Sequence, residues 1–183
     1  MRTLLIDLGH SKRFAGAVGI KSEVEWNRAI WKELKPLLNT KKWRILEVPT
    51  DYLTDWNSNR QLVNRINWIN RHAKVSDVLL SLHGNAASSP TARGVTTVYM
   101  GGSEYARKEA VKLSTSVSKA SKIPVWNGGA FDDRNARFGR VGLVRDTSPL
   151  ALLVEAGFVT SPKDMATSSR AIAEGIASYF NAF

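Results

Sequence analysis

Apolar residues along the chain fall into short uninterrupted runs and into longer stretches where they recur every three or four positions. The runs predict strands at residues 2–8, 43–48, 77–82, 95–100, 141–145 and 150–155. The longer stretches predict helices at residues 23–38, 57–72, 103–120 and 161–180. Alternation of strands and helices is typical of an α/β fold. We therefore expect one domain over residues 1–183, with a mostly parallel, twisted sheet of about six strands and helices on both faces.

Two local signals refine this pattern. Ser22 precedes the first helical stretch and Glu25 follows it by three residues, which is the capping-box pattern of a helix start. Residues 122–137 mix glycine, proline and charges without periodicity, so we expect a long loop there. Long loops in compact domains often carry function.

Polar residues with useful chemistry stand at the ends of three predicted strands. His10 and His83 each follow an apolar run, and Glu155 closes the run of residues 150–155. A carboxylate at the end of a buried strand is costly unless it is paired, bound to a metal or used in a reaction. Ligands of open α/β sheets bind at the carboxyl ends of the strands. The three residues therefore suggest a metal hydrolase.

A catalytic zinc ion usually takes three protein ligands and leaves one position for water. His10 and His83 are the natural histidine pair, because the remaining histidine, His72, ends a helix, where it would contact terminal carbonyl groups. The third ligand must then be a carboxylate. The residues alone leave it open, the candidates being Asp7, Glu23, Glu25 and Glu155. A second carboxylate is needed as a general base that stands off the metal.

Composition excludes several classes of protein. With 43% hydrophobic and 23% charged residues among 183, the chain has the composition of a globular domain. No segment has the 18 or so consecutive apolar residues of a membrane span. Absence of cysteine excludes disulfides and thiolate zinc sites. Asp7 and His10 interrupt the first apolar run, which we interpret as a strand and not as a signal peptide.

Charge and aromatic content bear on the partner. The formal net charge of +10 would attract polyanions such as cell-wall polymers or nucleic acid. The basic residues are spread along the chain without the tail or dense arm of many nucleic-acid binders, so we expect no nucleic-acid partner. Three tryptophans lie in helical patterns and are expected in the core, namely Trp26, Trp31 and Trp68. Trp56 and Trp126 lie in predicted loops and are candidates for sugar contacts.

A series of short motifs occurs in the order in which one enzyme family carries them. They are Ile6 to His10, Gly16-Ala17, Glu23 with Asn27, Arg65 to Asn70, Ser81 to Ala86, Gly94 with Val98-Tyr99, and Pro149 to Phe158. Together they resemble the zinc-dependent N-acetylmuramoyl-L-alanine amidases of the amidase-3 type. The matches cover nearly the whole chain. Residues 11–14 and 126–140 depart from the family pattern, and both segments are candidates for shaping the substrate groove.

The resemblance implies a role for each matching position. His10, Glu23 and His83 would hold Zn²⁺. Glu25 is the rival ligand, but the family's glutamate stands four residues before an asparagine, which here selects Glu23 and Asn27.

The resemblance also implies a mechanism in which Glu155 is the catalytic acid/base. Glu155 would take a proton from the attacking water and deliver it to the leaving amine of L-alanine. Asp7 and Asn85 would be supporting positions that orient ligands or substrate. Arg145 could assist, but a role at the surface or at a strand edge is the stronger interpretation.

The implied function is cleavage of the amide bond between N-acetylmuramic acid and L-alanine in peptidoglycan. A compact phage-type endolysin fits best: a monomer without a separate wall-binding domain, which binds neither nucleic acid nor membrane. A bacterial amidase exported by another route is the open alternative. It would wait in the cytoplasm of the producing cell and act at the bacterial wall after release.

Two other functions remain open on the sequence. A zinc peptidase would cut soluble peptides without needing the sugar, whereas the amidase needs a muramyl-peptide. A non-catalytic basic module for wall polymer or nucleic acid would not hold one zinc ion per chain.

Overall fold

Six strands form a single sheet in the order β2-β1-β3-β6-β4-β5 in the computed structural model, which describes residues 1–136 and 139–183. The strands are β1 (Arg2–Leu8), β2 (Trp43–Glu47), β3 (Val78–Asn85), β4 (Val95–Tyr99), β5 (Val125–Asp132) and β6 (Leu150–Phe158). The strands β2, β1, β3 and β6 run parallel, while β4 is antiparallel to β6 and parallel to β5. The predicted α/β fold with a mostly parallel six-stranded sheet is therefore confirmed.

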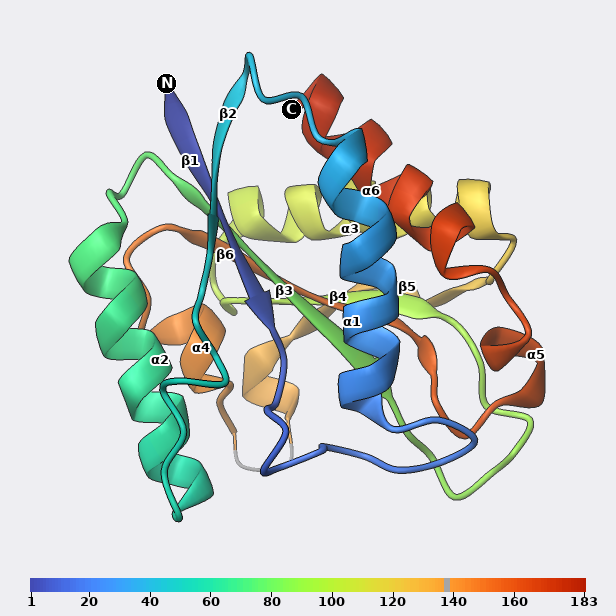
Figure 1. The fold of residues 1–183 in the computed structure, drawn as a ribbon. Coiled ribbons are helices and arrows are strands. Elements are labelled where there is room, and N and C mark those ends of the chain that lie inside the picture. The colour runs from blue at the N-terminus through green and yellow to red at the C-terminus, as the bar shows by residue number, and fades with distance from the viewer. Residues whose placement is uncertain (137–138) are drawn as a thin grey trace.

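Helices cover both faces of the sheet, with α1, α3 and α6 on one face and α2 and α4 on the other (Figure 1). The helices are α1 (Glu23–Leu34), α2 (Ser58–His72), α3 (Glu104–Ser121), α4 (Gly142–Arg145), α5 (Pro162–Met165) and α6 (Ser169–Ala182), with 3₁₀ turns η1 (Lys35–Leu37) and η2 (Asp133–Asn135). None of the helices within the described residues is long and apolar enough to cross a membrane.

The strand sequences explain why both faces are covered. Successive side chains of a strand point to opposite faces, and in β1 Leu4 and Ile6 pack with α1 and α6 while Leu5 packs on the α2 side. All three are fully buried. Strands buried on both faces become continuous apolar runs, which is the pattern that located β1, β3 and β6 in the sequence.

Two predicted elements are wrong. Residues 125–132, expected in a loop, form the edge strand β5, which pairs with β4 only. Most of β5 is incompletely buried and it contains Gly128 and Gly129, so it has no apolar alternation to reveal it. Residues 142–145, expected in a strand, form the short helix α4, whose Leu143 and Val144 are buried on the α2 side. A four-residue apolar run does not distinguish a strand from one helical turn.

The start of α1 follows its predicted signal. The Ser22 side chain accepts a hydrogen bond from the Glu25 backbone N–H, and the Glu25 carboxylate accepts one from the Ser22 backbone N–H. This capping box ends the preceding loop at Ser22 and places Glu23 in the first helical turn. The position of Glu23 is therefore set by local sequence.

Candidate metal centre

Three side chains from three elements lie close together at the carboxyl ends of β1 and β3. His10 follows β1, Glu23 opens α1 and His83 lies near the end of β3, and these segments meet at the lower edge in Figure 1. One nitrogen or oxygen atom from each side chain lies within 4.8 Å of the others. His83 Nδ1 is 2.6 Å from Glu23 Oε1, and His10 Nε2 is 3.2 Å from Glu23 Oε2. The residues that the sequence suggested as ligands are thus brought together.

Two glycines make this convergence possible. A Cβ atom on Gly9 would lie 2.3 Å from His83 Nε2, and one on Gly16 would lie 2.4 Å from Glu23 Oε2. Gly16 also has a φ of +73°, a conformation that side chains other than hydrogen disfavour. His10 itself adopts a left-handed φ of 65°, a strain of the kind that collects at functional sites. The backbone is therefore shaped around the three side chains.

Hydrogen bonds and charge keep Glu23 in place and ionised. Its carboxylate accepts hydrogen bonds from the backbone N–H groups of Ala17 (3.0 Å) and Gly84 (3.3 Å). Burial raises the pKa of Glu23, but hydrogen bonds and charge from His10 and His83 outweigh burial and hold that pKa well below its usual range. For His83, burial lowers the pKa, and the hydrogen bond to Glu23 raises it above its usual value.

The donor set fits a divalent metal ion. Two imidazoles and one ionised carboxylate are ligands that zinc accepts in a catalytic site. Glu25, the rival ligand, is exposed and engaged in the capping box, away from the two histidines. His72 lies at the end of α2, where its Nδ1 is 2.7 Å from the Trp68 carbonyl oxygen and its ring stacks on Trp68. His72 thus has the structural position that was predicted.

Glu155 lies beside the three candidate ligands, His10, Glu23 and His83, but is not one of them. On β6 it pairs directly with His83 of β3, so both side chains lie on the same face of the sheet. Its Oε2 atom is buried and has no hydrogen-bond partner among the described residues. Burial raises the pKa of Glu155 to about 7, with Glu23 adding to the effect and His83 opposing it. A carboxyl group with a buried, unpartnered oxygen next to candidate metal ligands is placed for proton transfer.

The two predicted supporting residues have different surroundings. The Asp7 carboxylate accepts hydrogen bonds from Arg65 Nη1 (2.9 and 3.1 Å) and from the Ser81 hydroxyl (2.6 Å). Asp7 therefore joins β1, β3 and α2 beneath the site and makes no hydrogen bond to the candidate ligands. Asn85 lines a pocket together with Glu155. Arg145 pairs with the buried Asp133, which assigns it a structural contact.

The pocket beside Glu155 contains residues that sequence reasoning missed. Its volume is about 210 Å³, and it is lined by Asn85, Thr96, Val98, Trp126, Phe131, Ala136, Val141 and Glu155. Thr96 and Val98 looked like ordinary strand residues, and the edge strand that carries Phe131 was not predicted. Two adjacent threonines, Thr96 and Thr97, interrupt the apolar residues of this strand, and nothing in the sequence distinguishes Thr96 from Thr97. Trp126, a candidate for sugar contact, is partly buried here, whereas Trp56 is 85% exposed.

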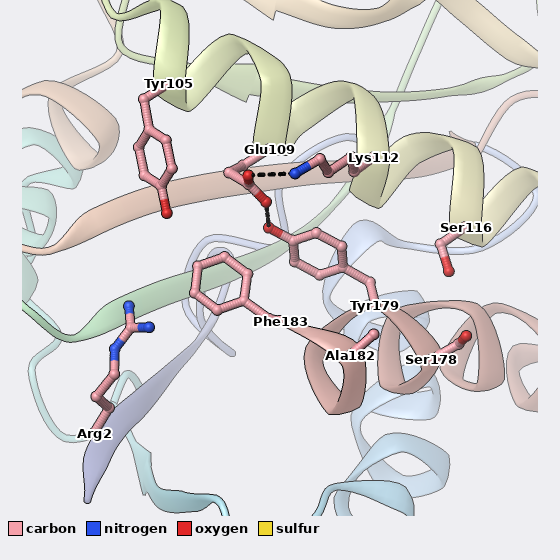
Figure 2. Close-up of a pocket in the computed structure, with 9 residues that line it drawn as sticks. All are labelled: Arg2, Tyr105, Glu109, Lys112, Ser116, Ser178, Tyr179, Ala182 and Phe183. Carbon is pink, nitrogen blue, oxygen red and sulfur yellow. Dashed lines mark hydrogen bonds and ion pairs between the residues drawn. The ribbon is translucent and has the colours of Figure 1, made fainter.

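A wider cavity of about 530 Å³ lies away from these residues, between the start of β1, α3 and the end of α6. Figure 2 shows Glu109 in its wall, with its carboxylate pointing to Tyr179 and Lys112. The Tyr179 hydroxyl and Lys112 Nζ both donate to it at 2.8 Å. Both carboxylate oxygens of Glu109 therefore accept a hydrogen bond. The cavity lies at the start of β1, whereas the candidate metal ligands lie at the carboxyl ends of β1 and β3.

Solved structures of amidases share this fold. The catalytic domain of CwlV, an N-acetylmuramoyl-L-alanine amidase from Bacillus (Paenibacillus) polymyxa var. colistinus, matches with a TM-score of 0.79 and 24% identity, covering 100% of this chain and 97% of that one. An N-acetylmuramoyl-L-alanine amidase from Clostridium difficile 630 matches with a TM-score of 0.80 and 24% identity, covering 99% and 95%.

A third similar structure is the catalytic domain of the CD27L endolysin targeting Clostridia difficile, with a TM-score of 0.78, 19% identity, and 100% and 98% of the two chains covered. A search of curated protein sequences returned no match. The family model described as N-acetylmuramoyl-L-alanine amidase matches residues 4–178, nearly the whole chain. The chain therefore belongs to the N-acetylmuramoyl-L-alanine amidase family of the amidase-3 type.

Proposed function

We propose that this amidase is zinc-dependent, with His10, Glu23 and His83 as the metal ligands and Glu155 as the catalytic acid/base. The observation that carries the proposal is the position of Glu155, one strand away from His83 on the same face, with a buried oxygen that no described residue engages. The substrate is the amide bond between N-acetylmuramic acid and L-alanine, as the family assignment states.

The site divides the chemistry between two groups of residues. A zinc ion held by His10, Glu23 and His83 would polarise the amide carbonyl and make a water molecule a better nucleophile. Glu155 accepts a proton from the attacking water and then donates it to the amide nitrogen as the bond to carbon breaks. Because the reaction needs Glu155 both as base and as acid, the residue must remain off the metal.

Replacing Glu155 with glutamine tests this assignment. Glu155→Gln keeps the size of the side chain but cannot accept the proton, so kcat should fall by about 10²- to 10⁴-fold, while zinc stays bound at one ion per chain. Glu25→Gln is the matched control, because Glu25 is exposed and serves only the capping box. Near-normal turnover by Glu155→Gln would disprove the role of Glu155.

The digestion of purified peptidoglycan identifies the bond that is cut. The wild-type enzyme should release new L-alanine amino groups without new reducing sugars, and a chelator should stop the release until zinc is restored. Cleavage of soluble peptides that lack the sugar would instead indicate the peptidase that the sequence left open. A protein that holds no zinc and cuts neither substrate would favour the basic binding module.

We also propose a lytic role at the bacterial wall, with peptidoglycan as partner and the monomer as the active form. Similarity to the catalytic domain of an endolysin supports this role. The enzyme would then be stored in the cytoplasm of the producing cell until release. Lysis of intact walls from outside by the purified protein at low concentration is the expected result.

A further inference from the structure

A row of three side chains crosses the sheet at the candidate active site. His83 on β3 pairs with Glu155 on β6, and Glu155 pairs in turn with Thr96 on β4. Directly paired residues of adjacent strands lie on the same face of a sheet. The sheet order β1-β3-β6-β4-β5 therefore places the ligand group on one side of Glu155 and the 210 Å³ pocket on the other.

Thr96 and Glu155 leave two polar atoms without partners next to each other. Thr96 is 1% exposed, and neither its Oγ1 nor Glu155 Oε2 forms a hydrogen bond with any described residue or with the other. A buried polar group without a hydrogen-bond partner destabilises the folded protein. Two of them facing one pocket indicate that a polar ligand, and not the protein, satisfies them.

Apart from Asn85 at the end of β3, the remaining wall of the pocket is apolar. Trp126 and Phe131 of β5 stack with nearly parallel rings at 6.4 Å, and Trp126 also meets Phe158 edge-on at 5.4 Å. Val98, Ala136 and Val141 complete this wall. A site with an apolar wall on one side and the polar side chains of Asn85, Thr96 and Glu155 on the other suits a peptide residue with a small apolar side chain.

The order of His83, Glu155 and Thr96 across the sheet determines which half of the substrate lies in the pocket. The acid that protonates the leaving nitrogen must stand on the nitrogen side of the scissile amide. The carbonyl of the scissile amide would be held at the candidate ligands His10, Glu23 and His83. The peptide of the substrate, which begins at the amide nitrogen, would therefore continue past Glu155 toward β4 and β5. The acyl half would lie in the opposite direction, over the loops that follow β1 and β2, where Trp56 is exposed and Arg13 stacks on it at 3.7 Å.

We propose that the pocket between β6, β4 and β5 receives the first residue of the stem peptide, L-alanine. Its methyl group packs against Trp126 and Phe131, and Thr96 is a positioning residue that hydrogen-bonds the peptide backbone. This inference rests on the proposed role of Glu155.

Muramyl-peptides that carry either L-alanine or glycine as the first residue test the apolar wall. Wild type should prefer L-alanine by about tenfold in kcat/KM, which is the value of one methyl group in an apolar pocket. Trp126→Ala should bring this ratio close to one. Trp56→Ala is the matched control, since it removes a tryptophan on the acyl side and should leave the ratio as in wild type. An unchanged ratio in Trp126→Ala would overturn the proposal.

Thr96 has a test that separates substrate binding from folding. Thr96→Val removes a hydroxyl group that has no partner in the folded protein, so thermal stability should be maintained or rise. If that hydroxyl binds the peptide, kcat/KM should still fall by about five- to tenfold, mainly through KM, and Thr96→Ser should restore it. Full activity of Thr96→Val would show that the hydroxyl is idle.

The outcomes also distinguish this inference from the proposed function. If wild type cleaves neither muramyl-peptide, the proposed function fails and the inference falls with it. If wild type cleaves both, Glu155→Gln is inactive and the two pocket variants behave as wild type, only the inference fails.

Discussion

At the scale of single residues, the site depends on what two glycines lack. Gly9 and Gly16 allow the His83 ring, the His10 ring and the Glu23 carboxylate to approach the backbone more closely than any Cβ atom would permit. The candidate ligands are conspicuous in the sequence, whereas this need for glycine is visible only in the folded structure. Glycine at positions 9 and 16 is therefore as necessary to this arrangement as the histidine and glutamate side chains.

Gly16→Ala should displace the candidate ligands Glu23 and His10. The added Cβ would lie 2.4 Å from Glu23 Oε2 and 2.6 Å from His10 Cδ2, so both ligands must move. We expect zinc affinity to fall at least tenfold, measured by competition with a chromogenic chelator. Gly102→Ala is the control, because Gly102 also has a positive φ but has no atom within 4 Å of the added Cβ. It should lose about 1–2 kcal/mol of stability and keep its zinc, and equal zinc loss in both variants would contradict the explanation.

At the scale of elements, prediction succeeded where the signal was local or repeated. The capping box at Ser22 located the start of α1, and apolar runs located the central strands β1, β3 and β6. The prediction missed the edge strand β5, because its pairing with β4 is a tertiary contact that the residues of β5 alone do not reveal. The same limit applies to the candidate site: His10, Glu23 and His83, which lie close together in the structure, were suggested from the sequence, while Thr96, which faces a pocket made partly by β5, was not.

The segment after β5 is anchored by one buried carboxylate. Asp133 is fully buried and accepts hydrogen bonds from Arg145 Nε (2.7 Å), the Gly101 N–H (2.8 Å) and the Val141 N–H (3.2 Å). Burial raises its pKa, but the hydrogen bonds outweigh burial, and the net pKa is lower than usual. This carboxylate therefore ties the end of β5 to α4 and to the turn before α3.

Asp133→Asn should lower the free energy of unfolding by about 2 kcal/mol at pH 7. The folded-state pKa lies below the unfolded value of about 3.9, so the contribution of Asp133 is complete above that pH and is lost as the pH falls through the folded value. Urea titrations of both proteins with chelator, from neutral pH to about pH 3, measure this difference. A difference that does not shrink in acid would show that the charge of Asp133 is not its source.

At the scale of the whole molecule, the dominant property is an excess of positive charge. The chain carries 26 lysines and arginines against 16 aspartates and glutamates, for a formal net charge of +10. Such an excess raises the local concentration of an anionic polymer around the protein without requiring any specific contact. Under the proposed lytic role, a wall that contains anionic polymers would be a partner of this kind.

Wall lysis should therefore slow as salt is added. Between about 0.1 M and 1 M salt, the Debye length shortens from about 10 Å to about 3 Å, which screens attraction between the protein and the polymer. Hydrolysis of a small, uncharged muramyl-peptide under the same conditions serves as the control and should change little. If both rates fell in parallel, salt would be acting on the active site and not on adhesion.

The sheet order has a consequence for engineering. The candidate ligands and Glu155 come from α1 and from the central strands or the loops that follow them, while half of the pocket residues, namely Thr96, Val98, Trp126 and Phe131, belong to β4 and the edge strand β5. Reaction and recognition would then be encoded in separable parts of the chain. Libraries confined to the pocket residues of β4 and β5 could retarget the enzyme to stem peptides with a different first residue while leaving its hydrolytic machinery intact.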